Sequence, residues 1–214
     1  PSGSGKGTMC KMLANHLGWH LLESGAIYRC LALKLLSADL LEAGVDEIVS
    51  VTKDLDLVFQ VTSRNDVITL LDNKDVSSAI RDENVGMAAS KIAPLSQVRL
   101  ALMDRQRAFC AAPGLVADGR DMGSVVFPEA KVKFYLDASA KERATRRFKQ
   151  LQAQDISVKF APLYEELLLR DQQDKDRKAS PLVVPQGALV IKTDDLSVSQ
   201  VFEQMLARIN RKNI

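Results

Sequence analysis

Apolar residues along this chain fall into short segments that alternate between helical and strand spacing. From Met9 the apolar positions follow a helical period as far as Gly18, a typical helix stop, and the apolar run 19–22 predicts a strand. The alternation continues, with helices predicted over 26–41 and 98–109 and strands over 114–118, 132–136 and 188–191. Alternating strands and helices predict an α/β fold built on a parallel sheet.

One stretch departs from this rhythm and predicts antiparallel strands. Residues 55–62 alternate between apolar and polar side chains, the polar turn 63–66 follows, and residues 67–71 are again largely apolar. Two strands joined by so short a turn form a hairpin, whereas parallel strands need a long crossover. We therefore expect residues 55–93 to form a lobe inserted into the parallel-sheet core.

Two further helices are predicted by their N-terminal caps. Ser139 with Glu142, and Ser197 with Gln200, have the spacing of a capping box, in which each residue's side chain accepts from the other's backbone N–H. Helices are therefore expected to begin after Ser139 and after Ser197.

Composition and charge limit the class of protein. The 214 residues are 46% hydrophobic, which suits one core with an inserted lobe rather than two large domains. No apolar run approaches the roughly 20 residues of a membrane-spanning helix, and the first residues do not resemble a secretory signal. The three cysteines lack metal-binding spacing and predict free thiols in a reducing compartment. A net charge of +2 is too balanced for a partner of nucleic-acid polymers. We expect a cytoplasmic monomer without a membrane partner.

The run PSGSGKGT, residues 1–8, predicts a phosphate-binding loop. Its glycines let backbone N–H groups curl toward an anion, Lys6 reaches the outer phosphates, and the next helix presents its positive N-terminal end. A Gly/Ser linker has a similar composition, but the predicted helix and strand that follow favour the loop. The first glycine of the pattern would stand before Pro1, so we expect an N-terminal truncation. The hydroxyl stands at Thr8 rather than directly after Lys6, a variant that points to kinases of small metabolites.

Charged residues supply the remaining candidate chemistry. Asp118, Arg120 and Asp121 follow a predicted buried strand, at the end where ligands bind in open parallel sheets. Arg143, Arg146 and Arg147 share one predicted helix face, and Arg170, Asp174 and Arg177 share another. Such faces are usually solvated, but beside a phosphate loop they suit the lid of a phosphotransferase, because phosphoryl transfer needs cations. The core is then expected over 1–54, 94–138 and 181–214, with the lid over 139–180.

These motifs together resemble the bacterial cytidylate kinases, a family of P-loop nucleoside monophosphate kinases. The resemblance rests on PSGSGKGT, LESGAIYR at 22–29, ADGRDMG at 117–123 with VVFP at 125–128, and Arg170-Asp171 with Asp174 and Arg177. It covers nearly the whole chain and departs at Gln173, where the family often has an arginine. The fold it implies is a P-loop NTPase-type parallel sheet flanked by helices, with an inserted antiparallel monophosphate-binding lobe and a helical lid.

The resemblance also implies a reaction and a set of site residues. The reaction is transfer of the γ-phosphoryl group of ATP to CMP or dCMP, with Mg²⁺ held mainly through phosphates and water and no metal site in the protein itself. The implied catalytic residues are Lys6, Arg120, Arg143 and Arg147. The implied ATP-binding residues are Ser2, Gly3, Ser4, Gly5, Lys6, Gly7, Thr8 and Arg146. The implied acceptor-binding residues are Ser24, Tyr28, Arg29 and Arg120 for the phosphate, Ser90, Arg99 and Asp121 for cytosine, Asp174 and Arg177 for the sugar, and also Asp118 and Arg170.

Two alternatives remain open at this point. A related P-loop kinase would act on another acceptor, such as UMP, AMP or a small alcohol. A nucleotide-binding module would hold the same ligands without turnover, although it would have less need of lid arginines.

Overall fold

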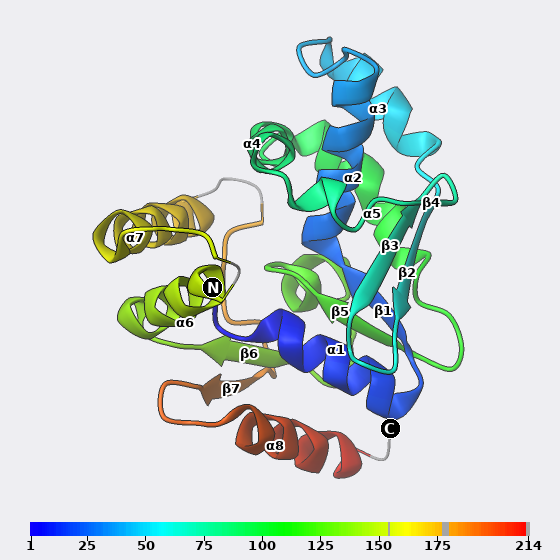
Figure 1. Cartoon of the computed structure of the whole chain (residues 1–214). Helices are drawn as coiled ribbons and strands as arrows, with labels where there is room; N and C mark the ends of the chain where they lie inside the picture. The colour runs from blue at the N-terminus through cyan, green and yellow to red at the C-terminus, as the bar shows by residue number, and fades with distance from the viewer. Residues whose placement is uncertain (154, 177–179, 213–214) are drawn as a thin grey trace. The chain divides into compact units, whose positions relative to one another are not determined.

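The computed structural model describes residues 1–153, 155–176 and 180–212, and the chain forms two compact units (Figure 1). The first unit combines Pro1–Met9 with Arg120–Ile214, and the second consists of Cys10–Gly119. One boundary falls within helix α1 (Lys6–Leu17) and the other directly after strand β5 (Leu115–Asp118). The predicted limits of core, inserted lobe and lid stay a prediction.

The second unit contains a parallel pair of strands. Strand β1 (His20–Glu23) pairs with β5 in a register that runs from His20 opposite Leu115 to Glu23 opposite Asp118. Both strands were predicted to within a residue or two. The expected full burial of β5 was wrong, because all four of its residues are half-buried. In the described part of the chain β5 pairs with β1 alone, and an edge strand keeps part of its surface exposed.

The predicted antiparallel segment is confirmed as a three-stranded sheet. Its order is β2 (Leu57–Val61), β3 (Val67–Leu71) and β4 (Lys74–Asp75). The hairpin turn between β2 and β3 closes with a 2.8 Å hydrogen bond from the Thr62 N–H to the Asp66 carbonyl. Strand β4 was not predicted, because two residues are too few to show a period. It follows a two-residue turn in which Asp72 and Asn73 have φ of 50° and 61°, as a type I′ turn requires.

Helices complete the second unit around α2 (Ser24–Ser37). Ile27, Leu31 and Leu35 recur every four residues on α2 and are fully buried, which is how an amphipathic helix covers a core. The others are α3 (Val45–Lys53), α4 (Glu83–Ile92), α5 (Ser96–Arg107) and the short 3₁₀ turn η1 (Ala79–Arg81). Helix α2 packs against α4, and α3 against α5. Helix α2 ends four residues earlier than predicted, at Ser37.

The first unit holds a second parallel pair, β6 (Phe134–Asp137) with β7 (Leu189–Lys192). Its helices are the short π-helix η2 (Met122–Val126), α6 (Ala140–Gln152), α7 (Phe160–Asp176) and α8 (Val198–Asn210). Helices α6 and α7 pack on each other, and Figure 1 shows them side by side. The α/β class, the parallel strands and the antiparallel strands all agree with the prediction.

The two predicted capping boxes have different outcomes. At Ser197 the box is complete, with hydrogen bonds of 2.9 and 3.2 Å to Gln200 in both directions. At Ser139 only half forms, where the hydroxyl accepts from the Glu142 N–H at 3.2 Å. The Ser139 N–H donates to Asp194 instead, at 2.8 Å, and the Glu142 carboxylate pairs with an arginine one turn along α6. The predicted helix starts after Ser139 and Ser197 are thus confirmed, although only half of the box forms at Ser139.

Candidate functional site

The phosphate-loop sequence forms a tight turn that leads directly into α1. Gly3 and Gly5 have φ of 78° and 90°, a region that residues with a side chain rarely adopt. Ser4 is buried and its hydroxyl donates to the Pro1 carbonyl at 3.0 Å. The Lys6 ammonium lies back over the loop and also donates to the Pro1 carbonyl. The loop thus stands at the positive end of a 12-residue helix with a lysine beside it, as anion binding requires.

Arg143, from the first turn of α6, lies in contact with this loop. Its side chain is 4% exposed. Its Nε donates to the Ala138 carbonyl and its Nη1 to the Ser2 carbonyl, both at 3.0 Å. Both terminal nitrogens also donate to the carboxylate of Asp171 on α7, the bidentate geometry that makes Arg–carboxylate pairs strong.

The other two arginines of α6 have different surroundings. Arg146 pairs with Glu142 at 2.9 Å and donates to the Thr193 hydroxyl at 3.0 Å, at the end of β7. Arg147 is exposed and donates to Gln150 at 3.0 Å. The predicted common face therefore runs from a buried guanidinium at Arg143 to a solvent-exposed one at Arg147.

A second arginine–carboxylate pair joins two predicted acceptor-binding residues. Arg120 Nε lies 2.5 Å from the Asp174 carboxylate, and Asp174 is 7% exposed. Asp121 is buried and caps the π-helix η2, with its carbonyl accepting from Val125 at 2.9 Å.

The predicted face of α7 needs a correction. Asp174 is buried but Arg170 is exposed, while Leu167 is buried and Asp171 half-buried. The inward stripe thus runs 167, 171, 174, set by the apolar anchor Leu167, and leaves Arg170 outside it. Arg177 lies outside the described residues.

In the second unit, predicted acceptor-binding residues gather on α2, α4 and α5. The Arg99 guanidinium lies 5.8 Å from the ring centre of Tyr28, within cation–π range, and donates to the Ala93 carbonyl at 3.2 Å. Arg29 donates to the Ile80 carbonyl at 2.6 Å. A Cβ at Gly86 would come within 2.9 Å of the Arg29 guanidinium, so glycine leaves room for that side chain.

Ser24 and Ser90 also lie on these helices. The Ser24 hydroxyl is buried and donates to Gln106 on α5 at 2.8 Å. Ser90 is exposed on α4, and its hydroxyl donates to the Gly86 carbonyl at 3.0 Å.

Asp118 ends β5 directly opposite Glu23 at the end of β1. Burial raises the pKa of Glu23, Lys11 at 4.0 Å opposes that rise, and the negative charge of Asp118 adds to it. Two carboxylates at adjacent strand ends therefore repel each other, which favours a proton on Glu23.

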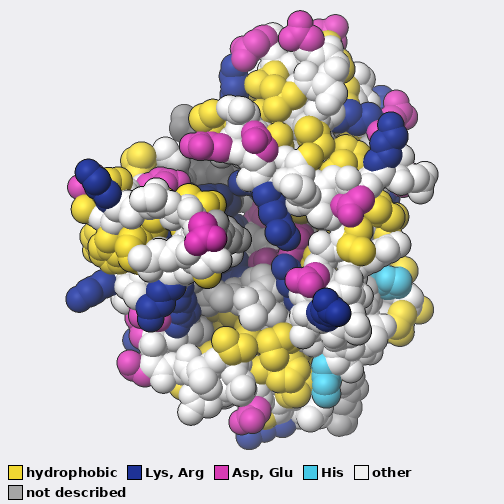
Figure 2. Space-filling view, in the orientation of Figure 1, with side chains coloured by type: hydrophobic (Ala, Val, Ile, Leu, Met, Phe, Trp, Pro, Cys, Tyr) yellow, Lys and Arg dark blue, Asp and Glu magenta, His cyan; other side chains and the backbone are white. Residues whose placement is uncertain are grey.

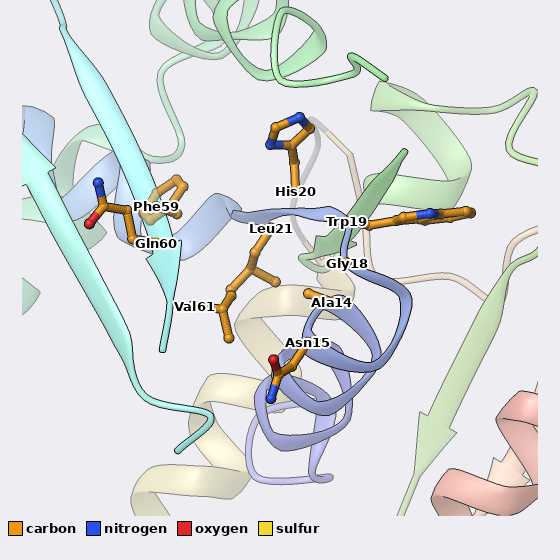
Figure 3. A pocket seen from close by; sticks show the side chains of 9 residues that line it. All are labelled: Ala14, Asn15, Gly18, Trp19, His20, Leu21, Phe59, Gln60 and Val61. Carbon is orange, nitrogen blue, oxygen red and sulfur yellow. The ribbon is translucent and has the colours of Figure 1, made fainter. Parts of the chain in front are cut away.

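A hollow of about 340 Å³ in the second unit has none of the predicted site residues in its lining. It is lined by Ala14, Asn15, Gly18, Trp19, His20, Leu21, Phe59, Gln60 and Val61, from α1, β1 and β2 (Figure 3). Asn15 is bound to Asn65 at 2.9 Å, and His20 contacts the Ala112 carbonyl at 3.0 Å. These lining residues include no lysine or arginine, so the hollow lacks the cations that a phosphate would need.

The described residues contain neither a cluster of metal-ligating side chains nor a membrane-spanning helix. No group of three or more His, Cys, Asp or Glu side chains among them could hold a metal ion. Of the helices in that described part, none has the length and apolar character to cross a membrane. Figure 2 shows basic and acidic side chains interspersed over the visible face, in line with the net charge of +2.

Sequence reasoning missed the partners that hold the predicted residues. Asp171 was quoted within a motif but given no role, although it holds Arg143. Gln106 and Gly86 were not singled out, although they contact Ser24 and Arg29. Only Asp171 carried a signal, because it stands three residues before Asp174 on one helix.

Comparison with known proteins gives one consistent result. The family model described as cytidylate kinase matches residues 1–211. The cytidylate kinase of Aeromonas hydrophila is 52% identical over 207 residues, which are 97% of this chain and 90% of that protein. Those of Shewanella frigidimarina and Vibrio parahaemolyticus are each 49% identical, over 99% of this chain and 93% of each relative.

Proposed function

Because the chain belongs to the cytidylate kinase family, we propose that it transfers the γ-phosphoryl group of ATP to CMP or dCMP, giving ADP and CDP or dCDP. The observation that carries the proposal is the phosphate loop at the start of α1, with Gly3 and Gly5 in left-handed conformations and Lys6 beside them. A loop of this kind binds the phosphates of a nucleotide.

The first unit supplies the groups for ATP. Backbone N–H groups between Ser2 and Thr8 and the Lys6 ammonium hold its phosphates, with Arg146 assisting. Mg²⁺, when bound, would neutralise charge that develops on the ATP phosphates. The exposed Thr8, in the first turn of α1, would offer its hydroxyl as an oxygen ligand of the kind this ion accepts.

For the acceptor, the phosphate is bound by Ser24, Tyr28, Arg29 and Arg120, supported by Asp118 and Arg170. Arg29 donates to the Ile80 carbonyl at 2.6 Å and to the Asp82 carbonyl at 3.4 Å, and these contacts orient its guanidinium. An arginine fork matches a phosphate in two parallel hydrogen bonds.

The cytosine and the ribose of the acceptor are bound by a separate set of side chains. Asp121, with Ser90 and Arg99, binds the cytosine edge, because a carboxylate accepts from the exocyclic amino group of cytosine. Uracil has a carbonyl oxygen at that place, which a carboxylate repels. Asp174 accepts from the ribose hydroxyls, as acidic residues do in other nucleotide sites, and Arg177 holds it.

The reaction is an in-line attack of the acceptor phosphate oxygen on the γ-phosphorus of ATP. The acceptor phosphate is largely ionised at neutral pH, so no side chain has to remove a proton. Catalysis then rests on positioning and on cationic stabilisation of the transferred group by Lys6, Arg120 and Arg147.

The proposal is tested with a panel of acceptors. Purified protein with ATP and Mg²⁺ is given CMP, dCMP, UMP or AMP, and ADP release is followed with a coupled assay. We expect the highest kcat/KM with CMP or dCMP. A higher kcat/KM for UMP or AMP would support a related kinase, and ATP binding without turnover on any acceptor would support a non-catalytic module.

The same panel applied to Asp121→Ala tests how the base is chosen. Removing this buried carboxylate should lower kcat/KM for CMP far more than for UMP, because sites built on a buried hydrogen bond discriminate strongly. Equal losses for both acceptors would assign Asp121 another role.

A further inference from the structure

Arg143 makes four hydrogen bonds to protein acceptors, and these account for most of its donor groups. They go to the Ala138 and Ser2 carbonyls and, in two parallel bonds, to the Asp171 carboxylate. The Arg143 side chain is 4% exposed and that of Asp171 is 14% exposed. A guanidinium in this state is already neutralised and fixed, so it is poorly suited to move onto a phosphate.

The phosphate loop packs directly on Arg143. A Cβ at Gly3 would lie 3.2 Å from the Arg143 Cβ and 3.6 Å from its carbonyl oxygen, so the loop backbone rests on the first turn of α6. The peptide between Ser2 and Gly3 has its C=O and N–H on opposite sides, as any planar trans peptide does. When Arg143 holds the Ser2 carbonyl, it therefore aims the Gly3 N–H away from itself.

Asp171 in turn is held by the packing of α7 on α6. At the other end of this helix pair, the rings of Phe148 and Phe160 meet edge to face with centres 6.0 Å apart, and Phe160 stacks on Tyr164 at 6.2 Å. Aromatic contacts at one end and the ion pair at the other fix α7 against α6.

We propose that Asp171 and Arg143 form a positioning pair for the phosphate loop, in which Asp171 fixes Arg143 and Arg143 fixes the Ser2–Gly3 peptide so that its N–H faces the ATP phosphates. This proposal rests on the proposed function and deepens it, since Arg143 then acts through the loop rather than by touching the nucleotide. The pair links α7 to the ATP phosphates.

The test compares Asp171→Asn with Glu165→Gln, an exposed carboxylate lost from the same helix. The readouts are equilibrium binding of ATP, equilibrium binding of CMP, kcat, and the melting temperature of each variant. We expect Asp171→Asn to weaken ATP binding at least about tenfold while CMP binding stays within about twofold, because small misplacements of positioning groups have large effects. Glu165→Gln should match the wild type in all four.

A second variant separates positioning from folding. Arg143→Lys keeps the positive charge but cannot hold both Ser2 and Asp171 in the same fork, so it should reproduce the loss of ATP binding. In the double variant the two losses should not add, because the residues act as one unit. A lower melting temperature with unchanged ATP binding, measured well below the transition, would overturn the proposal.

The outcomes also distinguish a failure of the positioning pair from a failure of the proposed reaction. Wild-type turnover of CMP with normal ATP binding in both variants would overturn the positioning pair alone. ATP binding that both variants weaken, in a protein that phosphorylates none of the acceptors, would support the pair and overturn the proposed reaction. A wild type that does not bind ATP would overturn both.

Discussion

Arginines in the two units are held in two different ways. In the first unit three of them contact carboxylates, with Arg120 on Asp174, Arg143 on Asp171 and Arg146 on Glu142, whereas Arg147 donates to the Gln150 side chain. In the second unit Arg29 donates to the Ile80 carbonyl, and Arg99 donates to the Ala93 carbonyl and lies over the Tyr28 ring. Arg105 donates to the Leu55 and Leu57 carbonyls, lies over the Phe109 ring and also pairs with Asp56 at 4.0 Å.

The carboxylate contact matters most for Arg143, because its side chain is only 4% exposed. A carboxylate neutralises the guanidinium and fixes it, and breaking a buried pair leaves an uncompensated charge. We therefore expect Arg143, which is almost fully buried and held in a fork by Asp171, to shape the site rather than to bind the nucleotide directly.

The largest expected effect is at Lys6 in the first unit. Its ammonium donates to the Pro1 carbonyl at the start of the phosphate loop. Lys6→Ala should lower turnover by at least about 10²-fold, comparable to the loss of one preorganised electrostatic donor. Steady-state kinetics with ATP and CMP would measure it. Near-normal turnover would remove the phosphate-loop assignment.

The next largest effect is expected at Arg29 in the second unit. Arg29→Ala should raise the KM for CMP at least about tenfold with little change in the KM for ATP, because hydrogen bonds to charged groups are worth about 1.5 to 3 kcal/mol. Arg105→Ala is the matched control. Arg105 holds the Leu55 and Leu57 carbonyls at 3.0 and 2.9 Å, so its loss should lower the melting temperature without changing the KM for CMP. Equal KM effects in the two variants would show that Arg29 is not a specific ligand of the acceptor phosphate.

Arg147 tests the comparison within one helix. It is exposed on α6, one turn after buried Arg143. Arg147→Ala should lower kcat by roughly tenfold and leave both KM values nearly unchanged, as expected for a cation used only in the transition state. Lys149→Ala removes another exposed charge from α6 and should have no such effect. An effect on KM alone would mean that Arg147 binds the ground state.

Helices, strands and turns were predictable from the sequence where neighbouring residues alone determine them. The helix ending at Gly18 and the β2–β3 hairpin follow from spacing and turn residues. The end of α2 and the half-formed cap at Ser139 were not predictable, because partners distant in sequence decide them, such as Asp194 for the Ser139 N–H.

Within the candidate site, motifs identified the charged residues but did not show which of them are buried and which are exposed. Helical spacing put Arg143 and Arg147 on one face, yet α7 buries the first and leaves the second exposed. Likewise, burial of Leu167 decides that Asp171 and Asp174 turn inward while Arg170 stays outside. Such packing between helices cannot be predicted from the spacing along either one.

The smallest expected effect concerns pH and the strand ends. Burial and Asp118 raise the pKa of Glu23 above its ordinary value although Lys11 opposes this. The folded state then holds the proton more tightly than the unfolded chain does, so stability is highest below the ordinary glutamate pKa and falls as pH rises through the raised value. Glu23→Gln avoids this loss.

This variant should melt up to about 2 °C higher than the wild type near neutrality, and its advantage should shrink at a pH below about 4, where Glu23 is protonated. Asp104→Asn, which removes an exposed carboxylate from α5, is the control. A stability gain that grew on acidification would contradict the raised pKa.

The most direct test of the account follows the phosphoryl group itself. Protein, Mg²⁺ and CMP are mixed with ATP that carries a radioactive γ-phosphate, and the labelled products are separated. We predict that the label appears in CDP in step with ADP formation, with little in inorganic phosphate. Label released only as inorganic phosphate, or kept in ATP while CMP stays unchanged, would contradict the claim that this site transfers a phosphoryl group to CMP.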